Sequence, residues 1–242
     1  MSEKRLAIIG DGRMGQAISQ LARDNGWRVT AMLGEGDTAG GSGINASTLA
    51  GARVAVEFTV PGAAVRNITA CLRAGVPVVV GTTGWYDALP EVTRIAQETG
   101  TGLLWSANFS PGVNIFLELA RYAGALLRPL AEFDAHIVET HHSAKKDAPS
   151  GTAIQIGKSV SEGLRRPVPI TSVRTGSVPG THELMFDSTF EQISLTHVAR
   201  DRRVFAEGAL RAAGWLIGKK GVFTMRDVLA PPSADAPSLE DA

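Results

Sequence analysis

The chain lacks several features that mark whole classes of proteins. It has one cysteine in 242 residues, Cys71, so no disulfide can form within it. Its 24 basic and 24 acidic side chains cancel, which leaves no basic excess for nucleic-acid binding. The first residues hold no apolar stretch typical of a secretion signal, and no apolar run is long enough to cross a bilayer. We therefore predict a cytoplasmic protein that binds neither nucleic acid nor membrane.

The composition that remains is that of a globular protein. Hydrophobic residues make up 44% of the chain, which is enough for a sizeable core in one large or two small domains. Cys71 falls within an expected helix, 64–74, where a lone thiol is better interpreted as a small buried hydrophobe than as a nucleophile.

A glycine-rich motif near the start predicts a dinucleotide site. The apolar run 6–9 is typical of a buried parallel strand, and a helical pattern follows the motif as far as Ala22. In G-x-G-x-x-G, the first glycine allows a tight turn, the second admits a pyrophosphate and the third lets the helix pack on the strand. The predicted cofactor-binding residues are Gly10, Asp11, Gly12, Arg13, Met14 and Gly15.

The sequence leaves the choice between NADH and NADPH open. A ribose-binding acid is expected about twenty residues further on, at the end of a second strand, 28–33. The chain has Gly34 at that point, with Glu35 and Asp37 just beyond. We take Glu35 as the candidate ribose ligand, while Arg13 lies close enough to the phosphates to tolerate the extra phosphate of NADPH. The predicted cofactor is therefore NADH or NADPH.

Strands and helices alternate through the first hundred residues, with further strands at 54–58, 76–80 and 102–105. This order predicts an α/β fold with a Rossmann-type doubly wound parallel sheet. Loops at the carboxyl ends of such strands contact ligands. They add six predicted cofactor-binding residues: Gly81, Thr82, Thr83, Ala107, Asn108 and Phe109. The Gly- and Ser-rich interval 34–51 is expected to be a mobile connection.

The pattern changes after Ser110. Expected helices at 113–127 and 152–164, with strands at 133–140, 170–175, 183–187 and 192–197, form a mixed α+β segment. We predict an inserted substrate-binding domain, 108–205. The dinucleotide-binding domain then comprises 1–107 and 206–230, and 231–242 is expected to be a disordered tail.

The densest chemical motif is the stretch 141–153. His141 and His142 can exchange a proton near neutral pH, and Lys145 adds fixed positive charge. Ser150, Gly151 and Thr152 are expected to present backbone N–H groups at a helix start, where a carboxylate docks. These groups suit an anionic substrate that undergoes proton transfer. They do not predict a metal, because neighbouring strand residues point to opposite faces and no further His or Cys cluster completes a site.

This stretch looks like the signature of the 4-hydroxy-tetrahydrodipicolinate reductase family, and the resemblance runs nearly end to end. It reads His141-His142-x-x-Lys145-x-Asp147-Ala148-Pro149-Ser150-Gly151-Thr152-Ala153. Shorter matches occur in the family's order at Gly12–Gly15, Phe58–Thr59, Gly81–Gly84, Ala107–Ser110, Arg174–Gly176, Thr196–His197, Arg202 and Phe205–Ala209.

The resemblance implies a nicotinamide-dependent reductase of diaminopimelate and lysine biosynthesis that acts on a small cyclic dicarboxylate. It implies a homotetramer held together through the second domain. In that family pattern His141 is the general acid and Lys145 a second proton donor and carboxylate binder. His142, Ser150, Gly151, Thr152 and Arg202 are the implied substrate-binding residues.

The chain departs from the family in two places. Its glycine loop is one residue shorter than in many members, and the family's ribose acid matches Gly34. Two other hypotheses stay open at this point. One is another two-domain nicotinamide-dependent dehydrogenase of amino or hydroxy acids, and the other is a non-catalytic NAD(H) sensor.

Overall fold

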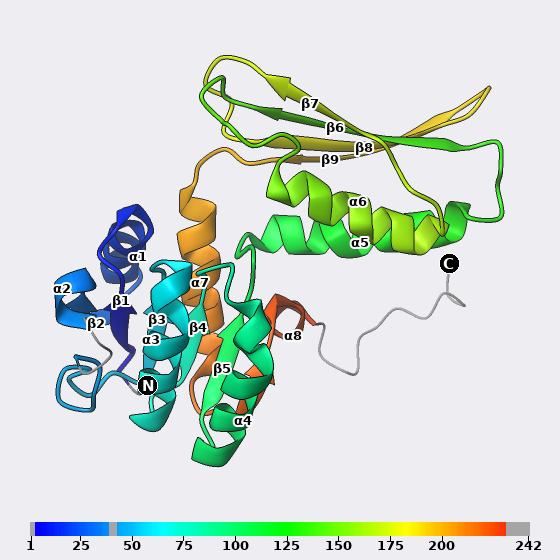
Figure 1. The fold of residues 1–242 in the computed structure, drawn as a ribbon. Coiled ribbons are helices and arrows are strands. Elements are labelled where there is room, and N and C mark those ends of the chain that lie inside the picture. The colour runs from blue at the N-terminus through cyan, green and yellow to red at the C-terminus, as the bar shows by residue number, and fades with distance from the viewer. Residues whose placement is uncertain (1–2, 39–42, 231–242) are drawn as a thin grey trace. The chain divides into compact units, whose positions relative to one another are not determined.

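The structure is a computed structural model that describes residues 3–38 and 43–230. It divides into two compact units (Figure 1). One ends at Phe109 and resumes at Phe205, and the other spans Ser110–Val204. The division predicted from the sequence, at 107/108 and 205/206, differs from this one by two residues and by one. The predicted tail, 231–242, lies outside the described residues.

The first unit contains a six-stranded parallel sheet, which confirms the predicted Rossmann-type fold. Its strands are β1 (Arg5–Ile9), β2 (Arg28–Leu33), β3 (Val54–Glu57), β4 (Val78–Val80), β5 (Gly102–Trp105) and β10 (Gly221–Phe223). They run in the order β10-β5-β4-β3-β1-β2. The order reverses between β1 and β3, and such a switch point is where open α/β sheets bind ligands.

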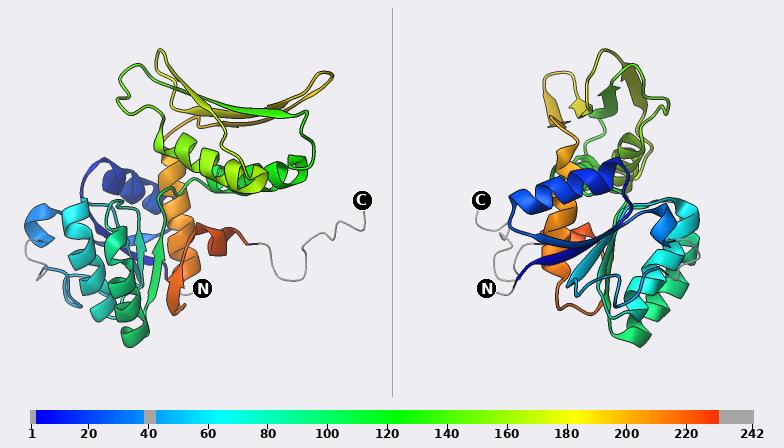
Figure 2. Two further views of the ribbon diagram at one scale, coloured as in Figure 1. Left: turned by 45° about the vertical axis from the view of Figure 1, so that its right-hand side comes forward. Right: turned by 90° about the vertical axis from the view of Figure 1, so that its left-hand side faces the viewer.

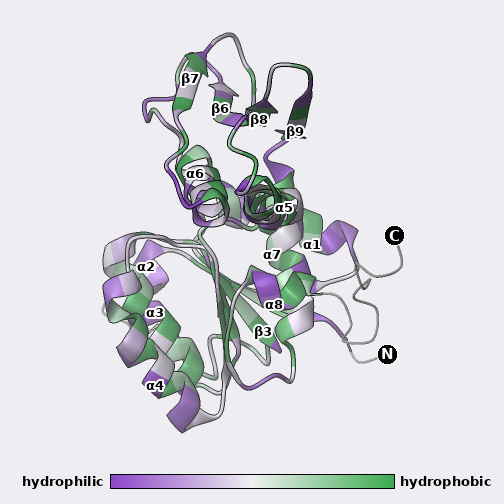
Figure 3. Ribbon diagram, turned by 90° about the vertical axis from the view of Figure 1, so that its right-hand side faces the viewer, coloured by the Kyte–Doolittle hydropathy of each residue, from purple (hydrophilic) through white to green (hydrophobic). Residues whose placement is uncertain are grey.

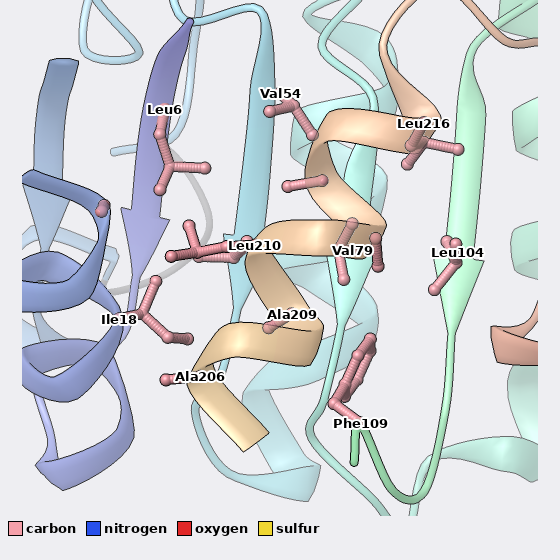
Figure 4. Packing of buried hydrophobic residues seen from close by; sticks show 14 of the residues in the cluster. Leu6, Ile18, Val54, Val79, Leu104, Phe109, Ala206, Ala209, Leu210 and Leu216 are labelled. Carbon is pink, nitrogen blue, oxygen red and sulfur yellow. The ribbon is translucent and has the colours of Figure 1, made fainter. Parts of the chain in front are cut away.

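Helices cover both faces of this sheet (Figure 2). Leu6 and Ile8 pack with α1 (Arg13–Asp24), α7 (Arg203–Leu216) and α8 (Met225–Leu229), as Figure 4 shows for Leu6. Ala7 and Ile9 point the other way, toward α3 (Pro61–Arg73) and α4 (Leu89–Thr99), with a short 3-10 helix η2 (Tyr86–Ala88) before α4. Both faces are buried because the strands are apolar at successive positions.

Cys71 belongs to the second of these two cores and is fully buried, as predicted. Burial, with a smaller contribution from the nearby Glu57, raises the pKa of the Cys71 thiol to about 12. A thiol that stays protonated is a poor nucleophile, so Cys71 acts as a packing residue.

The interval 34–51 is packed where the structure describes it, unlike the mobile connection that its composition suggested. A short helix α2 (Glu35–Thr38) follows β2 directly. Ile44 and Leu49 are buried in the second core, which anchors the later part of the segment. Residues 39–42 lie outside the described residues.

The second unit is a four-stranded mixed sheet with two helices. The strands are β6 (Asp134–His141), β7 (Ile170–Arg174), β8 (Thr181–Asp187) and β9 (Gln192–Val198), in the order β7-β6-β8-β9. Helices α5 (Pro111–Leu127) and α6 (Gly151–Leu164) lie side by side against one face (Figures 1 and 3). Burial therefore alternates along β6, with Ala135, Ile137, Glu139 and His141 on the covered face. No helix among the described residues of either unit is long and apolar enough to span a membrane.

Candidate active site

The glycine loop after β1 has the geometry that the motif predicts. Gly10 has a φ of +107°, and a Cβ there would lie 2.2 Å from the carbonyl oxygen of Phe58. A Cβ at Gly15 would lie 1.9 Å from the Gly10 oxygen, so the helix packs directly on the loop. Any side chain at either position would displace backbone.

Gly12 differs from these two glycines because open space surrounds the position of its missing Cβ. It is the N-cap of α1 and makes no side-chain cap to the first turn, which contains no acidic residue. The helix start therefore offers N–H groups and positive potential on an open side, together with exposed Asp11 and Arg13. These residues fit the pyrophosphate of a dinucleotide.

The segment after β2 places the candidate ribose ligand on the surface. Asp11 fills the space beside Gly34, where a Cβ would lie 2.6 Å from its Oδ2. Asp37 accepts a hydrogen bond from the Gly34 N–H at 2.9 Å, so its carboxylate closes the turn into α2. Glu35 is exposed at the first position of α2. Asp37 is exposed as well, so the two acids considered from the sequence differ in that the Asp37 carboxylate is already engaged by the Gly34 N–H.

The loops after β3, β4 and β5 are tied to one another. The Phe58 ring fills the space that a side chain at Gly81 would need, and it packs at 5.7 Å from the buried Phe109 ring. Thr59 N–H donates to the Thr82 hydroxyl at 2.7 Å. These contacts gather the predicted cofactor residues of the last two loops at the carboxyl edge of the sheet, where Thr83 and Ala107 are exposed. The Ser106 hydroxyl, which donates to the Asn108 oxygen at 2.7 Å, fixes the last loop.

In the second unit, His141 lies at the end of β6 beside a buried carboxylate that the sequence analysis did not single out. Its Nδ1 is hydrogen-bonded to Oε2 of Glu139, two residues earlier on the same face of the strand. The other oxygen of Glu139 accepts from Arg174 Nη2 at 2.6 Å and from the Ser150 N–H at 3.2 Å. Glu139 has no exposed surface.

Ser150 therefore plays a different part from the one predicted. We expected its N–H to face a ligand, but that N–H is used by Glu139, and the Ser150 hydroxyl caps α6 by accepting from the Ala153 N–H at 3.1 Å. Ser150 is almost fully buried, whereas Gly151 is exposed with open space around it. A carboxylate at this helix start would reach Gly151 and Thr152 rather than Ser150.

The loop between β6 and α6 carries the remaining charged groups. Lys145 forms an ion pair with Asp147 at 2.8 Å, and Arg174 Nη2 also donates to the Asp147 carbonyl at 2.6 Å. His142 turns to a separate partner, because its Nε2 accepts from Arg202 at 3.2 Å. All the predicted substrate residues lie in the second unit: His141, His142, Lys145, Ser150, Gly151, Thr152 and Arg202.

Two further histidines extend this cluster. His182 on β8 is directly opposite Glu139 in the sheet, and its ring lies 5.2 Å from that of His141. Its Nε2 lies 3.3 Å from the Ser150 hydroxyl. His197 on β9 is opposite His182, with the ring centroids 6.2 Å apart. Among the described residues, no group of three or more His, Cys, Asp or Glu side chains is arranged to hold a metal ion.

The protonation states follow from this burial. Burial alone would raise the pKa of Glu139, but hydrogen bonds from Arg174, Ser172 and His141 hold that pKa at about 2. Burial lowers the pKa of His141, although the Glu139 carboxylate opposes this shift. Burial, followed by the neighbouring His141 and His197, lowers the pKa of His182 to about 4.

Comparisons with known proteins show the family to which the chain is similar. Residues 4–109 match the family model described as dihydrodipicolinate reductase, N-terminus, and residues 112–229 match the corresponding C-terminus model. A protein of Christiangramia forsetii named 4-hydroxy-tetrahydrodipicolinate reductase is 35% identical over 237 residues, covering 93% of this chain and 97% of that protein. One of the same name from Methanoregula boonei is 38% identical over 253 residues, with the same coverage.

The fold also matches a solved structure. A dipicolinate-bound dihydrodipicolinate reductase from Paenisporosarcina sp. TG-14 superposes with a TM-score of 0.79 at 24% identity, covering 94% of this chain and all of that one.

Because His182 is buried as a neutral ring, we expect acid to destabilise the fold. The pKa of His182 is about 4 in the folded chain and 6.5 for an unperturbed histidine, so below the higher value the unfolded state binds a proton that the folded state does not. Stability present above pH 6.5 is therefore lost as the pH falls toward 4. We expect a loss of about 2 kcal/mol from His182 alone between about pH 7 and about pH 5.

The measurement is the urea midpoint at each pH. His182→Gln removes the titrating ring and should flatten the loss over this window. An equally steep loss in that variant would show that His182 does not cause it.

The two family models together cover almost the whole described chain, and the two relatives named above each match over 93% of it. The chain therefore belongs to the 4-hydroxy-tetrahydrodipicolinate reductase family and is a nicotinamide-dependent oxidoreductase.

Proposed function

We propose that this chain reduces 4-hydroxy-tetrahydrodipicolinate to tetrahydrodipicolinate and water, a step of diaminopimelate and lysine biosynthesis. The observation that carries the proposal is that His141 and the start of α6 both contact one buried carboxylate, Glu139, and that Arg174 links Glu139 to the loop that carries Lys145. The relatives bear the name of this activity, and the solved neighbour binds dipicolinate, a planar dicarboxylate of the same ring skeleton.

Positive groups in the second unit are suited to the two carboxylates of the substrate. The Lys145 ammonium and the N–H groups of Gly151 and Thr152 hold one of them, and the pair His142 and Arg202 attracts the other. Fixing the ring at both ends orients it for reaction, which is a large part of what an active site contributes.

His141 then supplies the proton. The substrate loses its hydroxyl together with a proton of the adjacent ring carbon as water, which leaves a conjugated imine. NADH or NADPH, when bound, would supply a hydride to the ring carbon that bore the hydroxyl. The imidazolium of His141 gives its proton to the enamine left by that addition, and solvent restores the proton on His141. Lys145 serves as the second proton donor beside it.

His141→Ala should lower kcat by about 10² to 10⁴ because it removes a positioned acid. Affinity for NADH, measured by fluorescence titration, should stay near that of the unchanged protein, since the glycine loop is untouched. Lys145→Ala should raise KM for the substrate. The matched control is Lys146→Ala, which changes the neighbouring exposed lysine. An undiminished kcat in His141→Ala would remove it as the acid.

The same assay separates the other two hypotheses. Nicotinamide absorbance is followed with freshly generated cyclic substrate, and dipicolinate is tested as an inhibitor. Turnover of an open-chain amino or hydroxy acid in place of the cyclic substrate would indicate a different dehydrogenase. Binding of NADH without turnover of either would indicate a sensor.

We propose that both NADH and NADPH are used, through different residues of the first unit. Glu35, exposed at the start of α2, accepts hydrogen bonds from the ribose hydroxyls of NADH, and Arg13, exposed at the start of α1, pairs with the additional phosphate of NADPH.

Arg13→Ala should lower kcat/KM for NADPH roughly tenfold while that for NADH changes little, because one charge-assisted contact is lost. Arg23→Ala, exposed in the last turn of the same helix, is the control. An equal loss with both cofactors would contradict this assignment.

We infer a homotetramer held through the face of the second sheet that points away from α5 and α6. Among the described residues no helix or strand covers that face, and it carries Val138, Val173, Met185 and Val198. Val198 is 56% exposed and Val173 is 37% exposed. Threonine, serine and charged side chains share this face with them, and it is the exposed valines that favour packing against another sheet.

Val173→Glu combined with Val138→Glu should reduce the molar mass measured by light scattering while far-ultraviolet circular dichroism is retained. Val60→Glu, which changes an exposed valine of the first unit, should keep the tetramer mass. A monomeric unchanged protein at micromolar concentration would disprove the inference.

A further inference from the structure

We propose that Glu139 is the positioning residue of the active site: its buried carboxylate fixes the orientation and the tautomer of His141. The inference rests on the proposed function only for the catalytic consequence, because the contact itself is within the second unit. Neither the resemblance nor the comparisons assign any role to Glu139.

The first step concerns the two nitrogens of His141. Glu139 and His141 alternate on β6 with Thr140 between them, so their side chains project from one face. An ionised carboxylate only accepts hydrogen bonds, so Nδ1 of His141 carries a hydrogen and Nε2 is the nitrogen that exchanges a proton with substrate. Gly180 leaves room at that atom, because a Cβ there would lie 3.0 Å from Nε2.

The second step concerns why the carboxylate cannot turn away. Oε1 of Glu139 accepts from Arg174 on β7 and from the N–H of Ser150 at the start of α6, while Oε2 is hydrogen-bonded to His141. Both oxygens of the carboxylate are therefore held in place. Rotation would leave a buried charge without its donors, which is costly. Arg174 also binds the carbonyl of Asp147, whose side chain pairs with Lys145. One carboxylate thus sets the positions of the imidazole, the lysine loop and the carboxylate-binding helix start.

The third step concerns the charge around His141. The groups that face it are Glu139 on its own strand, Arg174 on β7, His182 on β8 and Lys145 in the loop, with His197 of β9 behind His182. Glu139 is the one anion in this set, and it favours the imidazolium, while burial and the cationic groups disfavour it. Removing the charge of Glu139 should therefore move the titration of His141 to lower pH.

Glu139→Gln tests the proposal because the amide keeps the size of the side chain but can donate to Nδ1. That contact favours the tautomer with the hydrogen on Nε2. We expect kcat to fall on the order of 10²-fold, with KM for NADH unchanged, since a general acid is worth about that much. Because a general acid acts when protonated, the fall of rate with rising pH should begin at lower pH than in the unchanged protein. Glu191→Gln, an exposed glutamate of the β8–β9 turn, is the matched control and should change neither.

A merely structural ion pair with Arg174 predicts something else. In that case Glu139→Gln would lower the unfolding temperature, but the pH dependence of kcat of the folded protein would stay unchanged. This result would overturn the proposal. Glu139→Asp keeps the charge but shortens the side chain. The pH dependence of its kcat should therefore lie between that of Glu139→Gln and that of the unchanged protein.

A second measurement needs neither a variant nor activity. Nitrogen-15 NMR of the unchanged protein reports which nitrogen of His141 carries hydrogen in the neutral form. We expect the Nδ1–H form, and an Nε2–H form would overturn the proposal even if Glu139→Gln failed to fold. If the Nδ1–H form is found but the protein does not reduce the cyclic substrate, the proposed function fails and the positioning contact stands.

Discussion

A carboxylate that water does not reach must obtain its hydrogen bonds from the protein, and the second unit is organised around that requirement. Stripping an ion of water costs several kcal/mol unless donors replace the solvent. For Glu139 the donors are the His141 ring, the Arg174 guanidinium and the Ser150 N–H. These three come from the end of one strand, the end of its neighbour and the start of a helix. The hydrogen bonds that this buried charge requires therefore hold the ends of β6 and β7 and the start of α6 close together.

A second buried glutamate, Glu57, has no cation among the described residues beside its carboxylate, and its pKa shifts in the opposite direction. Glu57 ends β3 in the first unit and is also fully buried, but its partners are the uncharged Thr59, Thr82 and Asn67. Burial raises the pKa of Glu57, whereas the pKa of Glu139 is held at about 2. Glu139 has the Arg174 guanidinium and the His141 ring among its partners, and Glu57 has neither. Glu57 links the loops after β3 and β4 through Thr59 and Thr82, while Glu139 is the ionised centre of the second unit.

Local patterns were enough to predict strands β1 to β9, the glycine loop and the motif that carries the candidate substrate residues, but not strand β10. The alternation of 133–140 predicts β6 because period-two burial is a property of one strand alone. They were not enough to predict which side chains meet across strands. Arg174 is opposite His141 on β7, and His182 is opposite Glu139 on β8, and such register depends on pairing between distant segments. The alternation itself did place Glu139 on the face of His141, and that signal was available in the sequence. The three residues of β10 are too few to show any period.

The two units hold ligands by different physical means, and this explains why their sequence signals differ in strength. The first unit offers backbone N–H groups at the start of α1, and any amino-acid sequence has such groups. Its sequence signal is therefore a set of glycines, at which an added side chain would collide with Phe58 or Gly10. The same signal occurs in many dinucleotide-binding proteins. The second unit offers an imidazole and a guanidinium that Glu139 holds, and an ammonium that pairs with Asp147. Side chains of defined charge suit one substrate rather than a class of cofactors, so the motif that carries them identifies the family.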